Sequence, residues 1–520
     1  MSLQRILNSR FLTIFFVPFV LGLITVFGFK PFNFIFVNFL VFPLLFLIVS
    51  YVKKKSQNVY RKKPYLINLF FIGYFFGIGF FLSNTYWISN SLKFDETFKH
   101  LIPFAIILIP SFLGLFYGLG TLLAGPLIKN NFTSILIFTA SLSSIDYLRS
   151  KILTGFPWNL WAYSWSSFTE ILQILNTFGI FAFNLLCLTI FCLPLLLIFK
   201  TDKKFNKLIF LISVLIFFSN YLYGDYKLNK NDILLSKQKD FANIKVVSPS
   251  FDLKYNLSID EIGELTKKLI KYSEPKNEKK TIFIWPEGVF TGFSFSEVSL
   301  YKDLFVNNFS ENHLIVFGIN IEDKISNDYY NSLVIVNNNF EIIYRYNKKK
   351  LVPFGEFIPF RDYLSKLGLK KVTEGHGSFL SGEKQKNFIF ENLNIFPLIC
   401  YEIIFPQLTQ QIQYDTNIII NISEDAWFGG SIGPEQHFTK AIYRAIESNT
   451  FLVRAANQGH SAIIDNRGRV IKSLKPNETG NIELKIPLIN NSNKNRNDLI
   501  FFVLLFTYII IFFTLRNKLK

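Results

Sequence analysis

Residues 391–405, ENLNIFPLICYEIIF, decide how the C-terminal half of this chain folds. The apolar run 393–399 is short and rich in Ile, Leu and Phe, which indicates a buried strand of a layered sheet rather than a helix. Cys400 follows this strand directly, before Tyr401 and Glu402. A cysteine at such a strand end can present its sulfur in a cleft on a rigid support, although a lone cysteine is often only a small buried hydrophobe.

Two other polar side chains follow predicted strands in the same way. Glu287 comes after the strand 281–285, which a proline ends, and Lys348 comes after the hairpin strand 340–346. Ligand sites of α/β layers gather at the edge where strands end. We expect Glu287 to take the thiol proton, Lys348 to lower the thiol pKa and stabilise an oxyanion, and Cys400 to be the acylated nucleophile. A solvated ion pair is the alternative for the lysine and the glutamate.

Short strands alternate with helices from Asn243 onwards, which predicts an α/β layered domain. We expect helices at 259–272 and 435–449. The expected strands are 244–247, 281–285, 314–320, 332–337, 340–346, 393–399, 417–423, 451–456 and 461–465.

The rest of the chain has the composition of a membrane protein. The 520 residues are 50% hydrophobic and include 62 Phe, and the mean hydropathy is +0.29. We expect a membrane domain of seven transmembrane helices at 1–227, a soluble catalytic domain at 228–492, and a C-terminal helix with its tail at 493–520. The eight apolar runs, most of which reach the roughly 20 residues that cross a bilayer, are 11–29, 32–52, 65–89, 101–128, 132–148, 170–199, 207–224 and 498–515.

Basic residues between the apolar runs predict the orientation. With a cytoplasmic N-terminus, the inner segments hold the lysine and arginine clusters at 53–55, 61–63 and 200–207, whereas the outer loops hold only scattered basic residues. Seven crossings then place the soluble domain on the periplasmic side, and a miscount of one helix would invert this. The net charge of +18 is explained by these loops and a basic surface. Because the chain has no nucleic-acid-binding signature, we expect no nucleic-acid partner.

Residues 155–165, GFPWNLWAYSW, form an aromatic loop that is too short to span a bilayer. Such residues commonly anchor a protein at the lipid–water boundary. The functional alternative is that Trp158 and its neighbours line an entrance through which a lipid reaches the soluble domain. Asp146 and Arg149, one helical turn apart, are predicted to pair at the same interface.

The sequence does not support other catalytic or metal-binding arrangements. It contains no Gly-x-Ser-x-Gly elbow, and His376, His437 and His460 lack the spacing of metal ligands. Cys187 and Cys192 would lie on different faces of one helix, so they cannot form a disulfide. We expect neither a metal nor another cofactor.

A series of short motifs follows the strands of the C-terminal half. They are WPE at 285–287, YNKKKLVPFGEFIP at 346–359, ICYEIIFP at 399–406, DAWFG at 425–429, QHF at 436–438, RAIE at 444–447 and RAANQG at 454–459. On these motifs, residues 240–475 resemble the nitrilase (carbon–nitrogen hydrolase) superfamily, whose members use a Glu–Lys–Cys triad on an α-β-β-α sandwich. Together with GFPW and the seven-plus-one helix arrangement, the motifs are similar to those of the apolipoprotein N-acyltransferase family over nearly the whole chain.

The resemblance implies that Glu287 is the general base, that Lys348 supports the oxyanion and that Cys400 forms a thioester. Lys348 is selected among three consecutive lysines by its register with LVPFGE, eight residues before Glu356. Glu356 and Glu402 would hold the neighbouring backbone and the lysine. The remaining implied positions are Tyr401, which would shape the pocket, and Trp158, Tyr255 and Trp427, which would bind lipid or line its entrance.

The chain departs from the family pattern at three places. Ser248-Pro249-Ser250 replaces the usual Gln-x-Asn element, and Lys254-Tyr255 replaces a Lys-Trp pair. Glu424 stands where the family commonly has Asn or Asp before DAWFG.

The expected function is that of an N-acyltransferase in the inner membrane of a Gram-negative bacterium. It would move an acyl chain from a glycerophospholipid to the α-amino group of an apolipoprotein's diacylglyceryl-cysteine, by a ping-pong route and as a monomer. The alternative is a membrane-tethered amidase or nitrilase-type hydrolase, although a hydrolase of soluble amides would need no lipid access. A non-catalytic membrane scaffold is disfavoured because the Glu, Lys and Cys are all present.

The orientation predicts the outcome of cysteine labelling in intact spheroplasts. An impermeant thiol reagent should label a cysteine introduced at Asn307 but not one introduced at Ser56, because only the former lies in the domain expected outside. The protein without an introduced cysteine is the control, because it shows any labelling of the native cysteines. Labelling at Ser56 from outside would overturn the orientation.

Overall fold

The computed structural model divides the chain into two compact units. The first unit comprises Met1–Ser89, His100–Lys227 and Asn495–Lys520, and the second comprises Asn90–Lys99 and Leu228–Lys494. The segment 90–99 therefore groups with the second unit, which the apolar pattern did not indicate. The described residues are 9–59, 64–94, 96–254, 257–326, 328–359, 379–383, 386–413, 415–490 and 497–516.

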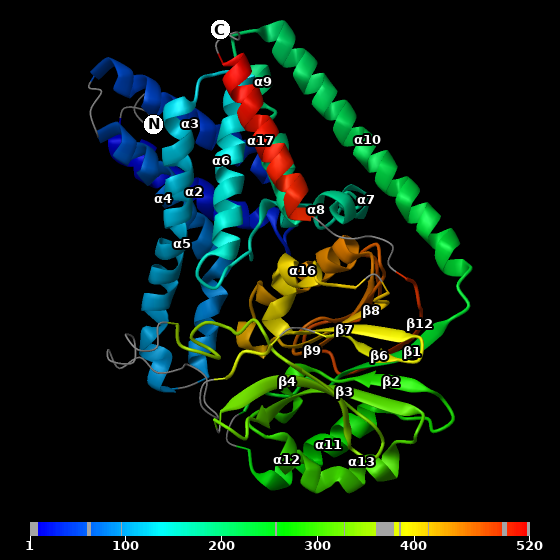
Figure 1. The fold of residues 1–520 in the computed structure, drawn as a ribbon. Helices are drawn as coiled ribbons and strands as arrows, with labels where there is room; N and C mark the ends of the chain where they lie inside the picture. Colours follow the sequence, from blue (N-terminus) through cyan, green and yellow to red (C-terminus); the bar gives the residue numbers. More distant parts are fainter. Residues whose placement is uncertain are drawn as a thin grey trace. The chain divides into compact units, whose positions relative to one another are not determined.

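The first unit is helical (Figure 1). Seven described helical stretches, which lie wholly or mostly in this unit, are long and apolar enough to cross a membrane: Phe11–Gly28, Ile35–Lys55, Tyr65–Lys93, Glu96–Leu127, Leu175–Ile198, Lys203–Ser236 and Asp498–Leu515. The α-helices are α2 (Val17–Ile24), α3 (Asn38–Val59), α4 (Pro64–Thr85), α5 (Ile102–Ala124), α6 (Phe132–Lys151), α7 (Thr169–Leu172), α8 (Leu175–Cys192), α9 (Leu195–Ile198), α10 (Lys203–Ser236) and α17 (Asn497–Leu515).

The prediction of eight spans is not confirmed. The run 132–148 does form a helix, α6, but α6 is not among the seven stretches that qualify in the described part of the chain. Its Asp146, its Arg149 and a series of Ser and Thr side chains lower its hydropathy. The orientation that rests on the loop charges stays a prediction.

The predicted pairing of Asp146 with Arg149 is confirmed, and the pair is buried rather than at a surface. Arg149 Nη2 lies 3.0 Å from Asp146 Oδ1, and both side chains are at most 1% exposed. Tyr117 Oη donates to Asp146 Oδ1 at 3.1 Å, and Asn184 Nδ2 donates to Oδ2 at 3.1 Å. Arg149 also donates to the carbonyl oxygen of Phe156. The network therefore joins α5, α6 and α8 to the aromatic loop.

The tryptophans of the aromatic loop are buried inside the first unit. Trp161 donates from Nε1 to Tyr117 Oη at 2.7 Å and stacks on Phe80 with 4.5 Å between ring centroids. Trp158 is 1% exposed and packs against Trp87, also at 4.5 Å. Within this unit the loop is a packed element, because its rings meet other rings and hydrogen-bond partners.

The second unit contains two six-stranded sheets, with strand orders β12-β1-β2-β3-β4-β5 and β11-β10-β9-β8-β7-β6. Each sheet has a parallel centre and antiparallel edges. The strands are β1 (Phe241–Ser248), β2 (Thr281–Ile284), β3 (His313–Glu322), β4 (Tyr329–Val336), β5 (Ile342–Asn347), β6 (Phe388–Phe390), β7 (Leu393–Ile399), β8 (Ile418–Glu424), β9 (Phe451–Asn457), β10 (Ser461–Ile464), β11 (Val470–Leu474) and β12 (Gly480–Pro487).

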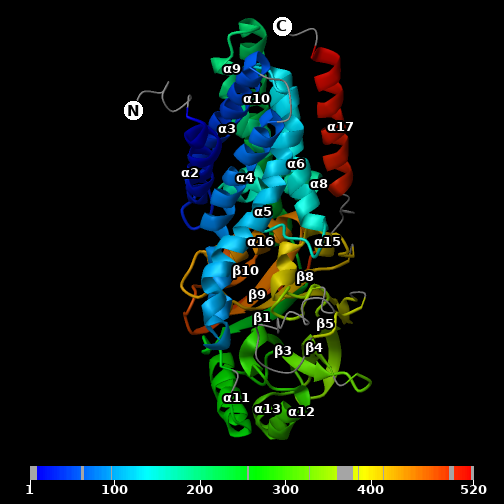
Figure 2. The ribbon, with the colours of Figure 1, turned by 90° about the vertical axis from the view of Figure 1, so that its left-hand side faces the viewer.

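Four layers make up this unit. Apolar side chains of both sheets form one shared core, from Ile244 and Ile284 on one side to Ile399 and Ile420 on the other. Helices α11 and α13 lie on the outer face of the first sheet, and α16 lies on the outer face of the second (Figures 1 and 2). The predicted α-β-β-α sandwich is confirmed. Its helices are α11 (Ile259–Ser273), α12 (Phe295–Val298), α13 (Lys302–Asn308), α15 (Pro406–Thr409) and α16 (Gly433–Ser448).

The predicted strands and helices are present, with ends that shift by a few residues. Three strands were missed: β6, β11 and β12. All three lie at sheet edges. Edge strands are short or exposed, as in β11, where four of five residues are exposed, so they lack the continuous apolar signal of central strands.

Breaking the buried pair in α6 should destabilise the first unit strongly. Asp146→Ala leaves a buried guanidinium without its carboxylate, which costs about 3–5 kcal/mol. We expect a clear fall in melting temperature in detergent, and partial recovery in the double variant Asp146→Ala/Arg149→Leu. Glu96→Ala is the control, because the Glu96–Lys99 pair is exposed and contributes little. Equal melting temperatures for Asp146→Ala and wild type would contradict a structural role.

Candidate active site

Cys400 lies where β7 ends and the 3-10 turn Cys400–Ile404 begins. Every residue of β7 is buried, and its parallel pairing with β8 makes the strand a rigid support. The φ angle of Cys400 is 48°, in the left-handed region that non-glycine residues seldom occupy. Such strained turns are common at reactive positions. The residue as a whole is 8% exposed.

Glu287 follows β2, as predicted, and is held by several neighbours. Gly318 of β3 packs against its backbone, because a Cβ there would lie 2.5 Å from the Glu287 carbonyl oxygen. The carboxylate accepts from Asn331 Nδ2 at 2.8 Å, from Lys348 Nζ at 3.2 Å and from the backbone N–H of Glu424 at 2.9 Å. These donors fix the orientation of the carboxylate.

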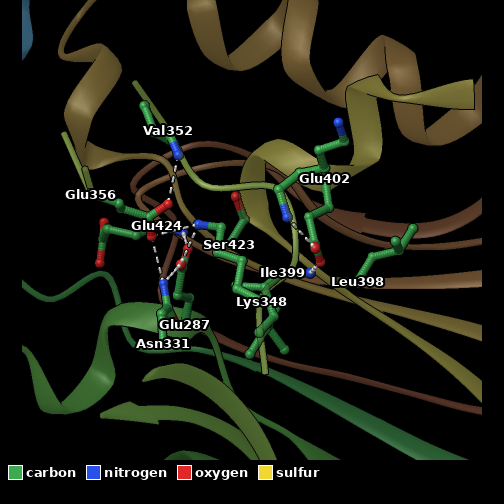
Figure 3. A network of polar contacts seen from close by, with 12 residues as sticks. Glu287, Asn331, Lys348, Val352, Glu356, Leu398, Ile399, Glu402, Ser423 and Glu424 are labelled. Carbon is green, nitrogen blue, oxygen red and sulfur yellow. Dashed lines mark hydrogen bonds and ion pairs between the residues drawn. The ribbon is translucent and has the colours of Figure 1, made fainter. Parts of the chain in front are cut away.

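Lys348 lies one residue after β5, and its side chain is 1% exposed. The ammonium contacts Glu287 Oε1 at 3.2 Å and Glu356 Oε1 at 2.9 Å (Figure 3). Burial by itself lowers the pKa of Lys348, but the charges of the two carboxylates outweigh it and raise the pKa well above its ordinary value. Lys348 therefore stays positively charged.

Glu356 completes the ion-pair group from the loop after β5. Its Oε1 accepts from Asn331 Nδ2 at 2.8 Å, and its Oε2 accepts from the backbone N–H of Val352 at 2.8 Å. Asn331 of β4 thus bridges Glu356 and Glu287 (Figure 3). Asn331 was not among the site residues predicted from the sequence. Its position in the otherwise apolar strand YYNSLVIV could have indicated a site residue, because a buried amide needs hydrogen-bond partners.

Glu402 joins the strand end that carries Cys400 to the lysine segment. Its Oε2 accepts from the N–H of Ile399 at 2.8 Å. Its Oε1 accepts from the N–H groups of Lys349 and Lys350, at 2.8 and 3.1 Å, and from Tyr346 Oη at 2.8 Å. Burial raises the pKa of Glu402, and these hydrogen bonds oppose the rise.

The charges of Glu287 and Lys348 affect the pKa of the Cys400 thiol. Burial and the negative charge of Glu287 raise its pKa well above the ordinary value, whereas Lys348 and a hydrogen bond with Ser423 oppose the rise. We expected Lys348 to lower the thiol pKa, and it acts in that direction but does not determine the net shift. These surroundings favour the protonated thiol of Cys400, and a protonated thiol needs a base to react.

The remaining predicted site residues lie outside the ion-pair group formed by Glu287, Lys348 and Glu356. Tyr401 follows Cys400 directly, and its ring meets Phe405 at 5.0 Å. In the second unit, Trp427 packs against Phe94 at 5.0 Å, and Asn90 Nδ2 donates to the neighbouring carbonyl oxygen of Phe428 at 2.7 Å. The segment 90–99 is thereby attached to the DAWFG turn. Trp158 belongs to the first unit, and Tyr255 and His376 lie outside the described residues.

The arrangement suits nucleophilic acyl transfer. A buried thiol lies in the electrostatic range of a carboxylate that can accept its proton and of an ammonium that stays charged. An ammonium has three N–H donors. In the described part of the chain, two of them face Glu287 and Glu356, so one is left to stabilise an oxyanion.

Two family patterns match the chain. Residues 256–490 match the carbon-nitrogen hydrolase family. Residues 21–193 match the apolipoprotein N-acyltransferase N-terminal domain. The two matches cover most of the second unit and most of the helical first unit.

Relatives of similar length match over nearly the whole chain. The apolipoprotein N-acyltransferase of Rhizobium rhizogenes is 30% identical over 474 residues, which cover 89% of this chain and 88% of that protein. The apolipoprotein N-acyltransferase of Bradyrhizobium diazoefficiens is 31% identical over 482 residues, with 90% and 88% coverage. Among solved structures, XC1258 from Xanthomonas campestris, a CN-hydrolase superfamily protein, is 16% identical, covers 48% of this chain and 91% of that chain, and has a TM-score of 0.35.

Removing one acceptor of Glu402 should loosen the candidate site. Glu402→Gln replaces an accepting oxygen by an amide nitrogen, so at least one backbone N–H loses its partner, at a cost of about 1–3 kcal/mol. We expect a lower melting temperature in detergent. Glu391→Gln is a matched control, because the ion pair of Glu391 with Lys280 is exposed and contributes little. If both variants melt like the wild type, Glu402 does not hold the two segments together.

Proposed function

The chain belongs to the apolipoprotein N-acyltransferase family, and from this premise we propose that it transfers an acyl chain from a glycerophospholipid to the N-terminal amine of diacylated apolipoproteins. The transfer would pass through a thioester on Cys400. The observation that carries this proposal is the ammonium of Lys348, buried between Glu287 and Glu356 beside the buried thiol. Such a group supplies a base, a fixed cation and a nucleophile at one place.

In the first half-reaction, Glu287 takes the proton of the Cys400 thiol as the sulfur attacks the ester carbonyl of the phospholipid. Burial raises the pKa of this thiol, so proton removal has to accompany the attack. Lys348 stabilises the oxyanion that forms. When the intermediate collapses, the C–O bond breaks and Glu287 returns the proton to the departing lysophospholipid oxygen.

In the second half-reaction, the neutral amine of the diacylglyceryl-cysteine attacks the thioester. Glu287 takes a proton from the attacking nitrogen, and Lys348 again faces the oxyanion. The C–S bond breaks, the amide forms and the Cys400 sulfur recovers its proton from Glu287. The enzyme is regenerated without any further reactant.

Membership of the family assigns a lipoprotein substrate and an inner-membrane location to this chain. The apolar helices of the first unit agree with that location. We propose in addition that the catalytic unit lies on the periplasmic side and that the protein acts as a monomer. We also propose lipid-binding roles for Trp158 in the first unit and Trp427 in the second.

The alternative is a nitrilase-type hydrolase that passes the same acyl group to water. Both reactions use the same nucleophile and base, so the site geometry alone supports either. The family pattern of the helical unit favours the transferase, because a hydrolase of soluble amides has no use for such a unit.

Mass spectrometry of the purified enzyme incubated with phospholipid alone separates the two. We expect a persistent acyl adduct on Cys400 and released lysophospholipid, with rapid loss of the adduct only after a diacylated lipopeptide is added. Rapid loss in buffer, with free fatty acid as the product, would establish the hydrolase instead.

Variants of Cys400, Glu287 and Lys348 in the same experiment test the role proposed for each residue. Cys400→Ser and Glu287→Gln should form little or no adduct, because the hydroxyl is hard to deprotonate and the amide cannot accept a proton. Lys348→Ala should slow loading by roughly 10²–10³-fold, as for removal of one oxyanion donor. Lys349→Ala is a matched control, since its backbone N–H contact with Glu402 survives the change.

A further inference from the structure

Glu424 is a second acidic residue beside Glu287, at the end of β8. Its backbone N–H donates to Glu287 Oε2 at 2.9 Å. Its carboxyl group lies against the residue after Glu287, because a Cβ at Gly288 would be 1.9 Å from Glu424 Oε2. The general base of the proposed reaction is therefore oriented by the backbone of Glu424 and flanked by its side chain.

The side chain of Glu424 fixes the turn that presents this N–H. Its Oε1 accepts from the N–H of Ala426 at 3.0 Å, two residues further on. Its two oxygens also accept from Asn457 Nδ2, at 3.1 and 2.9 Å. A carboxyl group that binds the N–H two residues on closes a local turn. The conformation at the end of β8 thus depends on the length of this side chain.

Asn457 extends the connection to the segment after β1. It donates from Nδ2 to the carbonyl oxygen of Phe251 at 2.8 Å and accepts from the N–H of Phe251 at Oδ1, also at 2.8 Å. Gln458 Nε2 donates to the same carbonyl oxygen at 3.0 Å. The preceding residue, Ser250, has a φ of 50°, so the chain turns sharply where this anchor begins.

We propose that Glu424 is a positioning residue for Glu287. Hydrogen bonds from Ala426 and Asn457 hold its carboxyl group in place. This deepens the proposed function and rests on it for the role of Glu287 as general base. In this role the side chain acts through the N–H that orients the Glu287 carboxylate. Through Asn457, the same side chain links the segment at Phe251 to the base.

The role depends on shape rather than on charge. Burial raises the pKa of Glu424 well above its ordinary value, and the nearby carboxylates of Glu287 and Asp425 add to the rise. Ala426 and Asn457 each donate to Oε1, so a glutamine with its oxygen at that position keeps these two contacts and loses only the contact of Asn457 Nδ2 with Oε2. An aspartate is one methylene shorter and cannot hold both.

The test measures two reactions of Cys400 in the purified full-length enzyme. One is acyl loading from phospholipid, and the other is alkylation by iodoacetamide, located by mass spectrometry of the Cys400 peptide. Both need Glu287 in place, but only the first requires the proposed acyltransferase activity. Far-UV circular dichroism and melting curves establish that each variant is folded.

We expect Glu424→Gln to slow both reactions by less than about tenfold, because it loses only the contact of Asn457 with Oε2 and keeps those at Oε1. Glu424→Ala and Glu424→Asp should each slow both by about 10- to 100-fold, the value of one hydrogen bond to a charged group. The phospholipid concentration that gives half-maximal loading should not change, since the base and not the lipid site is affected. Asn457→Ala should slow both reactions too, and less than additively with Glu424→Ala.

Several results would overturn the proposal. Wild-type rates in folded Glu424→Asp would show that the turn does not orient the base. Equal damage in Glu424→Gln and Glu424→Ala would show that charge matters and not shape. If wild type does not load but alkylation follows the expected order, the proposed function fails while the positioning role of Glu424 stands.

Discussion

The site depends on one physical requirement: the buried positive charge of Lys348 has to be compensated. A charge removed from water is costly unless opposite charges and hydrogen bonds replace the solvent. Glu287 and Glu356 provide those charges, and Asn331 bridges the two carboxylates. The requirement to compensate one cation therefore sets the positions of Glu287 and of the loop that carries Glu356.

The two sheets bring this group to the thiol. Glu287 and Lys348 follow β2 and β5 of the first sheet, whereas Cys400 and Glu424 stand at the ends of β7 and β8 of the second. A shared apolar core holds the sheets face to face, so strand ends far apart in the chain meet. Hydrogen bonds of two further carboxyl groups fix the backbone at these strand ends. Glu402 links the end of β7 to the segment that follows Lys348. Glu424 links the end of β8 to the turn at Ala426.

Much of the fold could be predicted because central strands and membrane helices have strong apolar patterns. β7, β8 and the strand before Glu287 were identified from such runs. The edge strands β6, β11 and β12 were not: β6 has only three residues, β11 is largely exposed, and β12 has only two buried residues among eight, so none has a continuous apolar run. The apolar run 132–148 suggested a span in α6, but Asp146 and Arg149 belong to an internal network and reduce its apolar character.

The sequence by itself determined which side chains follow buried strands: Glu287, Lys348 and Cys400 are all placed by local patterns and by motifs of their family. It could not determine which groups compensate their charges, because such contacts join residues distant in the chain. The bridge by Asn331, the net rise of the Cys400 pKa and the contact of Glu424 with Glu287 were decided by tertiary structure alone. The physical reason is that burial and the distances between charges exist only once the sheets have packed together.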